Sequence, residues 1–113
     1  MKKAFTILLL SVGLLTSCEK VDIAKNTPEC IEDKIRDFAK DDPCEEGASV
    51  KEYLFQNELV YVFSLGNCVN DASEEVRDDD CTTLGYIGGL AGNRKINGAD
   101  FSQAEYKRTV WEK

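Results

Sequence analysis

The sequence predicts an α+β fold in which one N-terminal helix packs on a small antiparallel sheet and disulfides staple the two together. Ile31, Ile35 and Phe38 recur at helical spacing and form one apolar stripe. Residues 48–65 are rich in β-branched and aromatic side chains on both sides of Gln56-Asn57, a pattern typical of a β-hairpin. Of the five cysteines in the 113 residues, four are spread through this predicted domain.

The predicted helix spans residues 28–40. Thr27 suits the N-cap, and Pro28 suits the first helical position, where no backbone N–H is needed. Asp42 precedes Pro43 and is therefore disfavoured from helical angles, so the helix should end there. We expect the apolar stripe to face the core.

The predicted hairpin has a definite register. A two-residue turn at Gln56-Asn57, where asparagine tolerates positive φ, places Phe55 opposite Glu58 and Val50 opposite Phe63. Side chains alternate along a strand, so one face of the hairpin presents a set of apolar residues on which the helix can dock. This set consists of Val50, Leu54, Leu59, Tyr61 and Phe63.

The opposite face of the hairpin carries Tyr53, Phe55, Val60 and Val62. These four side chains are too apolar for open water. Either a further layer of the chain or a partner should cover them, so they form a possible binding surface.

The hairpin also bears on disulfide pairing. If it is extended, Cys44 comes to lie one residue off direct opposition to Cys68. Pairing Cys30 with Cys44 is harder, because ten helical residues carry the chain about 15 Å away and the remaining four span at most about 14 Å. That leaves Cys30 with Cys81. Four cysteines allow three connectivities, however, and the sequence alone does not choose between them.

Residues 66–80 are predicted to form an acidic loop, with one helical turn capped by Asp71 and Glu74 as an option. Clustered carboxylates suit calcium, and the run Asp78-Asp79-Asp80 is the densest cluster. No calcium-loop spacing is present, and solvated acids are the commoner case, so no metal ligand is assigned and calcium binding stays undecided. A carboxylate acid/base pair is weaker still, because a polar loop has no apolar pocket to separate the two pKa values.

The C-terminal third should add strands. Residues 84–93 hold four glycines among apolar residues, which favours a strand with bulges or a close backbone crossing against the hairpin over a phosphate-binding loop. Asn97-Gly98 is a tight-turn dipeptide, and Ser102 to Glu105 resembles a capping box for one turn. Residues 106–111 alternate as a strand, and Trp111 is expected in the core.

Composition excludes several functions. The chain has no histidine, which removes the usual general base, the commonest transition-metal ligand and every Ser-His or Cys-His nucleophile. Its formal net charge is −7, which repels phosphates and makes nucleic acid an unfavourable partner. No cofactor and no catalytic residue is assigned.

The first 17 residues have the features of an export signal. Lys2 and Lys3 precede an apolar run over residues 4–15, followed by small residues. Twelve helical residues reach about 18 Å, against roughly 30 Å of membrane hydrocarbon, so a transmembrane helix is disfavoured. The segment Leu15-Thr16-Ser17-Cys18 resembles a bacterial lipobox.

The lipobox resemblance implies cleavage before Cys18, a diacylglyceryl thioether on its sulfur and an acyl chain such as palmitate on the new amino terminus. Two or more chains anchor a protein stably to a membrane without crossing it. Residues 18–27 would form a flexible tether and residues 28–113 the domain. We expect the cell envelope, with the outer membrane (periplasmic or surface face) favoured, and its oxidising conditions favour two disulfides from Cys30, Cys44, Cys68 and Cys81.

A second resemblance covers about residues 30–112. The chain is similar there to a family of short bacterial lipoproteins that carry a C-terminal domain of unknown function. The matching features are structural ones, and no catalytic residue is carried over. They are Cys30-Ile31, Ala48 to Tyr53, Val60-Tyr61, Gly66-Asn67-Cys68, Cys81 and Gly88 to Asn93.

Three functions remain open. The first is a lipid-anchored binding or scaffolding module that contacts an envelope protein partner through the hairpin face or through residues 85–93. The second is a small disulfide-stapled inhibitor or immunity protein. The third, a hydrolase that uses carboxylates from Asp71 to Asp80, has no partner base or metal motif in its favour.

Overall fold

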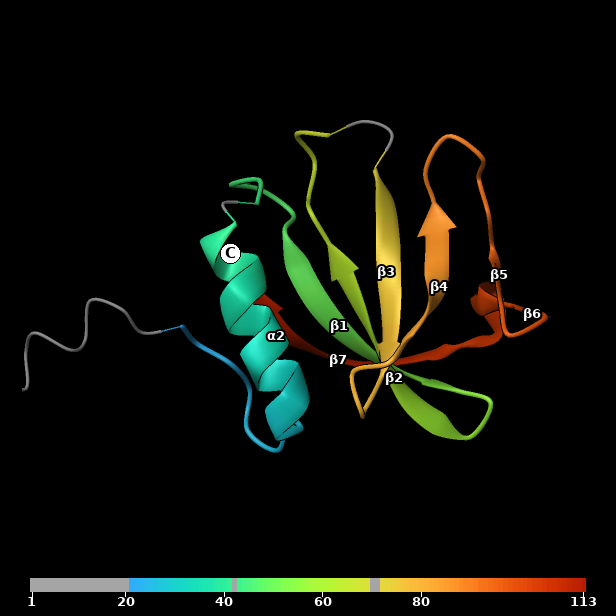
Figure 1. Cartoon of the computed structure of the whole chain (residues 1–113), viewed down its shortest axis with the longest axis horizontal. Helices are drawn as coiled ribbons and strands as arrows, with labels where there is room; N and C mark the ends of the chain where they lie inside the picture. The colour runs from blue at the N-terminus through green and yellow to red at the C-terminus, as the bar shows by residue number, and fades with distance from the viewer. Residues whose placement is uncertain (1–20, 42, 70–71) are drawn as a thin grey trace, which may run out of the picture.

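The computed structural model describes residues 21–41, 43–69 and 72–113. One helix and a five-stranded antiparallel sheet, in the order β4-β3-β2-β1-β7, make up most of it, and a two-stranded ribbon β5-β6 adds a small third part (Figure 1). This is the α+β fold that the sequence predicts. The elements are α2 (Glu29–Lys40), β1 (Ser49–Phe55), β2 (Glu58–Ser64), β3 (Ser73–Asp78), β4 (Thr83–Gly88), β5 (Lys95–Ile96), β6 (Ala99–Asp100), the 3-10 turn η3 (Phe101–Gln103) and β7 (Glu105–Glu112).

Helix α2 lies where the apolar stripe predicts, but its N-terminus differs from the prediction. Pro28 is the flanking N-cap residue, with an extended ψ of 142°, and no side chain caps the helix. Thr27 is not the N-cap, because its hydroxyl donates to the Ala24 carbonyl at 2.7 Å and closes a turn before the helix. The helix ends at Lys40, with Asp41 as C-cap; Asp42 lies outside the described residues. Within the described part of the chain, no helix is long and apolar enough to span a bilayer.

The hairpin of β1 and β2 has the predicted register. Val50 pairs with Phe63 and Phe55 with Glu58. Both turn residues adopt positive φ, 53° at Gln56 and 66° at Asn57, as a two-residue turn that follows the right-handed twist of the strands requires. The turn chemistry and the apolar alternation therefore agree, which is why the register was predictable.

The helix docks on the predicted face of this hairpin and forms the first core. The Phe38 ring meets Phe63 and Trp111 edge-on, with centroids 5.5 and 5.9 Å apart. Trp111 is 7% exposed, which confirms its core position. At the far end of the hairpin, Leu59 is 38% exposed, so the helix covers only part of the face. The buried members of this core are Ile31, Ile35, Ala48, Val50, Tyr61, Phe63, Val110 and Trp111.

The opposite face of the sheet is covered by the chain itself. Phe55, Val60 and Val62 are only 3, 1 and 5% exposed, because Ile96 of β5 and Phe101 of η3 pack on them in a second core. Of the two predicted covers, a further layer or a partner, the chain supplies the layer. These three side chains are therefore not exposed to open water, although Val62 still lines a cleft on this face.

Part of the predicted acidic loop is a strand. Residues Ser73–Asp78 form β3, which pairs with β2 on one side and β4 on the other. Its single apolar residue, Val76, is fully buried opposite Val62 and Gly85. The optional helical turn is wrong, since Glu74 lies within the strand; Asp71 falls outside the described residues. Pairing on both sides supplies the strand conformation that one apolar residue does not predict.

The glycine-rich segment forms β4 and the loop that follows it. The pairing of β3 with β4 shifts register between Val76 and Arg77, so the expected bulge is present. The expected close approach occurs at Gly85, where a Cβ would lie 2.9 Å from Ile96 Cδ1. The neighbour at this approach is β5 and not the hairpin.

The turns near the C-terminus match the prediction in part. Asn97 and Gly98, with φ of 52° and 79°, connect β5 to β6 as expected. The capping box does not form. Asp100 caps η3 instead by accepting from the Ser102 amide at 2.8 Å, and Glu105 already belongs to β7.

Two disulfides form, and they are the pairs favoured by the sequence geometry. Cys30–Cys81 joins the first turn of α2 to the turn after β3, with a Cα–Cα distance of 6.0 Å. Cys44–Cys68 joins the segments that flank the open end of the hairpin, with a Cα–Cα distance of 5.5 Å. Both bonds tie the helix side of the molecule together.

The segment before the helix is part of the domain. The Ala24 amide donates to the Val110 carbonyl of β7 at 2.9 Å, and Val21, Ile23 and Ala24 pack against the first core. The flexible tether predicted for residues 18–27 is therefore wrong from Val21 onward. The few apolar side chains within this polar stretch are the ones that pack on the domain.

Candidate functional site

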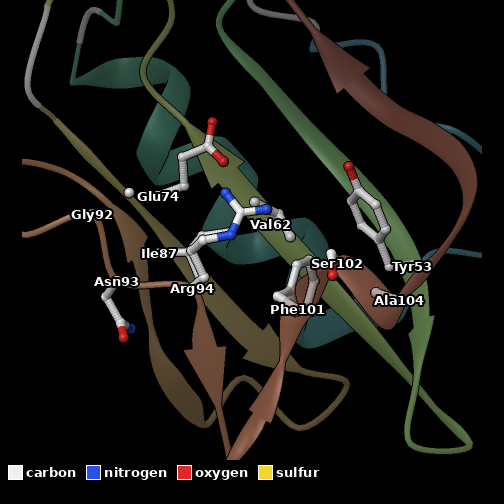
Figure 2. Close-up of a pocket in the computed structure, with 11 residues that line it drawn as sticks. Tyr53, Val62, Glu74, Ile87, Gly92, Asn93, Arg94, Phe101, Ser102 and Ala104 are labelled. Atoms are coloured by element: carbon white, nitrogen blue, oxygen red, sulfur yellow. The ribbon is translucent and has the colours of Figure 1, made fainter.

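A cleft of about 430 Å³ opens on the face of the sheet opposite the helix (Figure 2). It lies between the sheet and two later segments, the loop from β4 to β5 and the turn η3. The loop belongs to the segment 85–93 that the sequence proposes for binding. The residues that line the cleft are Tyr53, Val62, Glu74, Ile87, Gly88, Gly92, Asn93, Arg94, Phe101, Ser102 and Ala104.

Four neighbouring strands each contribute one side chain to the lining of the cleft. Tyr53 comes from β1, Val62 from β2, Glu74 from β3 and Ile87 from β4. Side chains alternate along a strand, so the antiparallel register brings these four to one face. Tyr53 is the member of the predicted hairpin surface that stays partly exposed.

Asn93 fixes the loop that overhangs the cleft. Its side-chain amide donates to the carbonyls of Tyr86 and Lys95, at 2.6 and 3.1 Å. Its own carbonyl accepts from the Gly88 amide at 2.8 Å. The loop is thus held to the end of β4. This role of Asn93 was not predicted, although asparagine side chains in turns commonly bond to the nearby backbone.

Three polar side chains face the cleft unbound. Figure 2 shows the Arg94 guanidinium over the cleft, near Glu74 and Val62, with Tyr53 on the opposite wall. Across residues 21–41, 43–69 and 72–113, neither Glu74 nor Arg94 has an ion-pair partner within 4.0 Å, and the Tyr53 hydroxyl has no hydrogen-bond partner. A pocket with an apolar floor and a few convergent polar groups is the usual form of a small-molecule site.

The electrostatics of the cleft keep Tyr53 neutral. Burial raises the pKa of Tyr53, and the negative charge of Glu74 and the neighbouring Tyr106 raise it further. The hydroxyl is therefore available as a donor at neutral pH. At the rim, hydrogen bonds from Ser102 lower the pKa of Asp100, so this carboxylate is ionised and already occupied.

A second polar cluster lies on the helix side of the sheet. Glu52 is 6% exposed, accepts from the Tyr61 hydroxyl at 2.9 Å, and pairs with Arg108 through Nε at 3.0 Å. Burial, followed by this hydrogen bond, raises the pKa of Tyr61. Arg108 also donates to the carbonyls of Lys25 and Asn26, at 2.7 and 3.2 Å. All three side chains are engaged, so this cluster fastens the N-terminal segment and is not a ligand site.

The acidic residues of the predicted carboxylate site are divided. Glu74 faces the cleft, whereas Glu75 points to the other face and pairs with Arg77 at 3.0 Å. Asp78, Asp79 and Asp80 lie close enough to share an ion, but Asp78 Oδ1 accepts the amides of Asp80 and Thr82 at 2.9 Å and shapes the turn. An exposed acidic turn of this kind needs no metal.

Cys18, the predicted lipidation site, lies outside the described residues. The four other cysteines form the two disulfides and leave no thiol for chemistry in the described domain. The candidate site therefore consists of the cleft.

The fold and the cleft together define a class of protein: a small disulfide-stapled α+β domain that presents a ligand-sized cavity beside its sheet. The family described as Domain of unknown function (DUF6970) matches residues 36–113, and the chain belongs to this family. The matched range contains all seven strands and every residue that lines the cleft. No curated protein and no solved structure matches the chain.

Proposed function

We propose that this protein is a lipid-anchored binding module of the cell envelope that holds a small ligand in the cleft beside β4. The observation that carries this proposal is the cleft itself, in which Tyr53, Glu74 and Arg94 converge beside an apolar floor without a partner among the described residues. Arg94 is exposed, and Glu74 and Tyr53 are partly exposed, so all three are accessible to a ligand that enters the cleft.

Anchoring is supported by the resemblance of Leu15-Thr16-Ser17-Cys18 to a lipobox and by the two disulfides, which are typical of exported proteins. Three residues from Cys18 to Val21 reach at most about 11 Å. Val21 already packs on the domain, so the domain would sit close to the bilayer. The β4–β5 loop lies at the far end of the molecule from the blue segment after residue 20, so the cleft would be turned away from the lipid (Figure 1).

The anchor is tested by following the exported chain in membrane and soluble fractions. Wild-type protein should fractionate with membranes, and its N-terminal peptide should show the mass of a lipidated Cys18. The Cys18→Ser variant should appear in the soluble fraction without acyl mass. An unmodified, leader-bearing chain in the cytosol contradicts the proposal.

Binding is tested by filling the cleft. Ser102 lines the cleft, whereas its neighbour Gln103 does not, so Ser102→Trp and Gln103→Trp form a matched pair on η3. Small molecules extracted from the envelope should raise the melting temperature of wild type and of Gln103→Trp, because a ligand that binds the folded state stabilises that state. They should not raise the melting temperature of Ser102→Trp, in which the indole fills the cleft. Equal responses of the two variants would place binding elsewhere.

A second candidate, an inhibitor of a secreted enzyme, is favoured by one observation. Leu90 is 85% exposed at the tip of a turn in which the Gly92 amide donates to the Gly89 carbonyl at 3.1 Å. A single apolar side chain on a braced loop is suited to fill an enzyme pocket. Saturating wild-type protein should then suppress a susceptible secreted protease, and Leu90→Asp should restore its activity. If every protease in a panel of secreted enzymes keeps full activity at saturating wild-type protein, this candidate function is wrong.

A further inference from the structure

We infer that the ligand of the cleft is a small zwitterion with an apolar side group, an apolar amino acid or a short peptide. This inference rests on the proposed function, because it assigns the chemistry of the same cleft. Arg94 would receive the carboxylate, Glu74 the ammonium group, and the apolar floor the side chain.

The charges favour a zwitterion over a singly charged ligand. Arg94 and Glu74 both line the cleft, and neither has an ion-pair partner in the described part of the chain. A purely anionic ligand that reaches Arg94 would face the repulsion of Glu74, and a purely cationic one the repulsion of Arg94. The net charge of −7 opposes the approach of anions from a distance as well. A ligand with one charge of each sign satisfies both groups.

The remaining polar lining groups are already engaged within the protein. The Asn93 side chain bonds Tyr86 and Lys95, and the Gly88 and Gly92 amides are held by carbonyls of the same loop. Ser102 is bonded to Asp100. Recognition therefore falls to Arg94, Glu74 and the hydroxyl of Tyr53, whose raised pKa keeps it a donor.

The rest of the cleft is apolar. Val62, Ile87 and Ala104 line it together with the ring of Phe101. The rings of Tyr53 and Phe101 meet edge-on at 5.3 Å, which leaves an aromatic wall beside the aliphatic floor. A cavity of about 430 Å³ lies within the range of small-ligand sites and is large enough for an amino acid or a dipeptide.

Calorimetric titration of the exported protein with four probes tests this inference. Leucyl-phenylalanine carries both charges, its N-acetyl form lacks the ammonium group, its C-terminal amide lacks the carboxylate, and glucuronate is an anion without an ammonium group. The free dipeptide should bind with a dissociation constant below about 1 mM, and each blocked form should bind about tenfold more weakly, the usual effect of one charge-assisted hydrogen bond.

The two charges are assigned by crossing the probes with protein variants. In Glu74→Gln, acetylation of the dipeptide should no longer weaken binding, and in Arg94→Gln, amidation should no longer weaken it. Lys95→Gln is the matched control, because this exposed neighbour of Arg94 does not line the cleft and should keep both penalties. Circular dichroism melts verify that each variant is folded.

Two results overturn the inference. One is equal affinity of wild type for the free and the blocked dipeptides, or for glucuronate; the other is no heat from the free dipeptide. Either result leaves the proposed function standing as long as envelope extract still stabilises Gln103→Trp and not Ser102→Trp. Loss of that difference, by contrast, overturns the proposed function itself.

Discussion

The two faces of the sheet carry the same trio of polar side chains in opposite conditions. On the helix face, Tyr61 and Arg108 both bond to Glu52; Tyr61 and Glu52 are buried, and Arg108 is partly exposed. On the cleft face, Tyr53, Glu74 and Arg94 line a cavity and have no partner among the residues that the structure describes. A tyrosine, a glutamate and an arginine thus stabilise the fold where they satisfy each other, and are available to a ligand where they do not.

The covers of the two faces explain this difference. The helix face is closed by the twelve residues of α2 and by the segment before it. The cleft face is covered only by the two short strands of the ribbon β5-β6 and the three residues of η3. These short elements pack over Phe55 and Val60 but do not extend over Glu74. The uncovered part of the sheet face is the cleft. We therefore expect the fully covered face to contribute mainly to stability and the partly covered face to be available for binding.

The largest expected effect contrasts the two cores. Ile35 and Ile96 are both fully buried, one under the helix and one under the short ribbon. Ile35→Ala should lower the free energy of unfolding by about 4 kcal/mol, since a tightly closed core relaxes little around a cavity. Ile96→Ala should lower the free energy of unfolding by about 2 kcal/mol, because the space left by the side chain adjoins the cleft and neighbouring side chains can move into it. Urea unfolding with the disulfides intact measures both. Equal costs would remove the contrast.

The next effect compares the two glutamates. Glu52→Gln breaks the ion pair between buried Glu52 and partly exposed Arg108, and it should cost about 2 kcal/mol in urea unfolding, because solvent screens part of the charge that is left without a partner. Glu74→Gln should stay within about 0.5 kcal/mol of wild type, since it removes no internal bond. A destabilisation of Glu74→Gln as large as that of Glu52→Gln would show that Glu74 is structural.

A smaller effect concerns the N-terminal segment. Arg108 binds the carbonyls of Lys25 and Asn26, so the bond that trypsin cuts after Lys25 is held in place. Arg108→Gln should speed this cleavage about tenfold, which equals about 1.4 kcal/mol of lost local protection. Lys107→Gln serves as the control, and the cleavage sites are assigned by mass spectrometry. Unchanged cleavage after Lys25 in the Arg108 variant would show that other contacts hold the segment.

The smallest effect is a pH dependence. The pKa of Tyr61 is raised above its ordinary value of 10.0, so the folded state holds the proton more tightly than the unfolded state. Tyr61 therefore contributes its full stability below pH 10 and loses it as the pH rises further. Tyr61→Phe should lower the free energy of unfolding by about 1 kcal/mol at pH 7. Above pH 10, the free energy of unfolding of this variant, measured in urea, should fall less steeply with pH than that of wild type. The same decrease in the free energy of unfolding above pH 10 in both proteins would contradict a raised pKa of Tyr61.

Sequence reasoning recovered the features that local chemistry determines. The hairpin register followed from Gln56-Asn57 and the apolar alternation around it, and the register in turn favoured the pairs Cys44–Cys68 and Cys30–Cys81. Strand β3 was missed, because its strand conformation comes from pairing on both sides and not from its own residues. Long-range pairing overrides weak local preference in such a segment.

The cleft was only partly predictable. The glycine-rich segment 85–93 is a candidate for binding from the sequence alone, and it forms one wall of the cleft. The opposite wall depends on η3 folding back over β1 and β2, which brings Phe101 to Tyr53 across 48 positions of the chain. Nothing in the local sequence shows that Arg94 and Glu74 remain unpaired, because that follows from where the ribbon ends.

The N-terminal segment and Asn93 have a joint consequence for crowding. Ala24 bonds to the outer strand β7, and the Asn93 amide bonds to the Tyr86 carbonyl on the outer strand β4. Each edge strand of the sheet is thereby partly covered by the chain's own residues. Natural proteins use such covers to prevent edge-to-edge pairing of sheets between copies. Copies of this domain at high concentration should therefore not polymerise through the edges of their sheets.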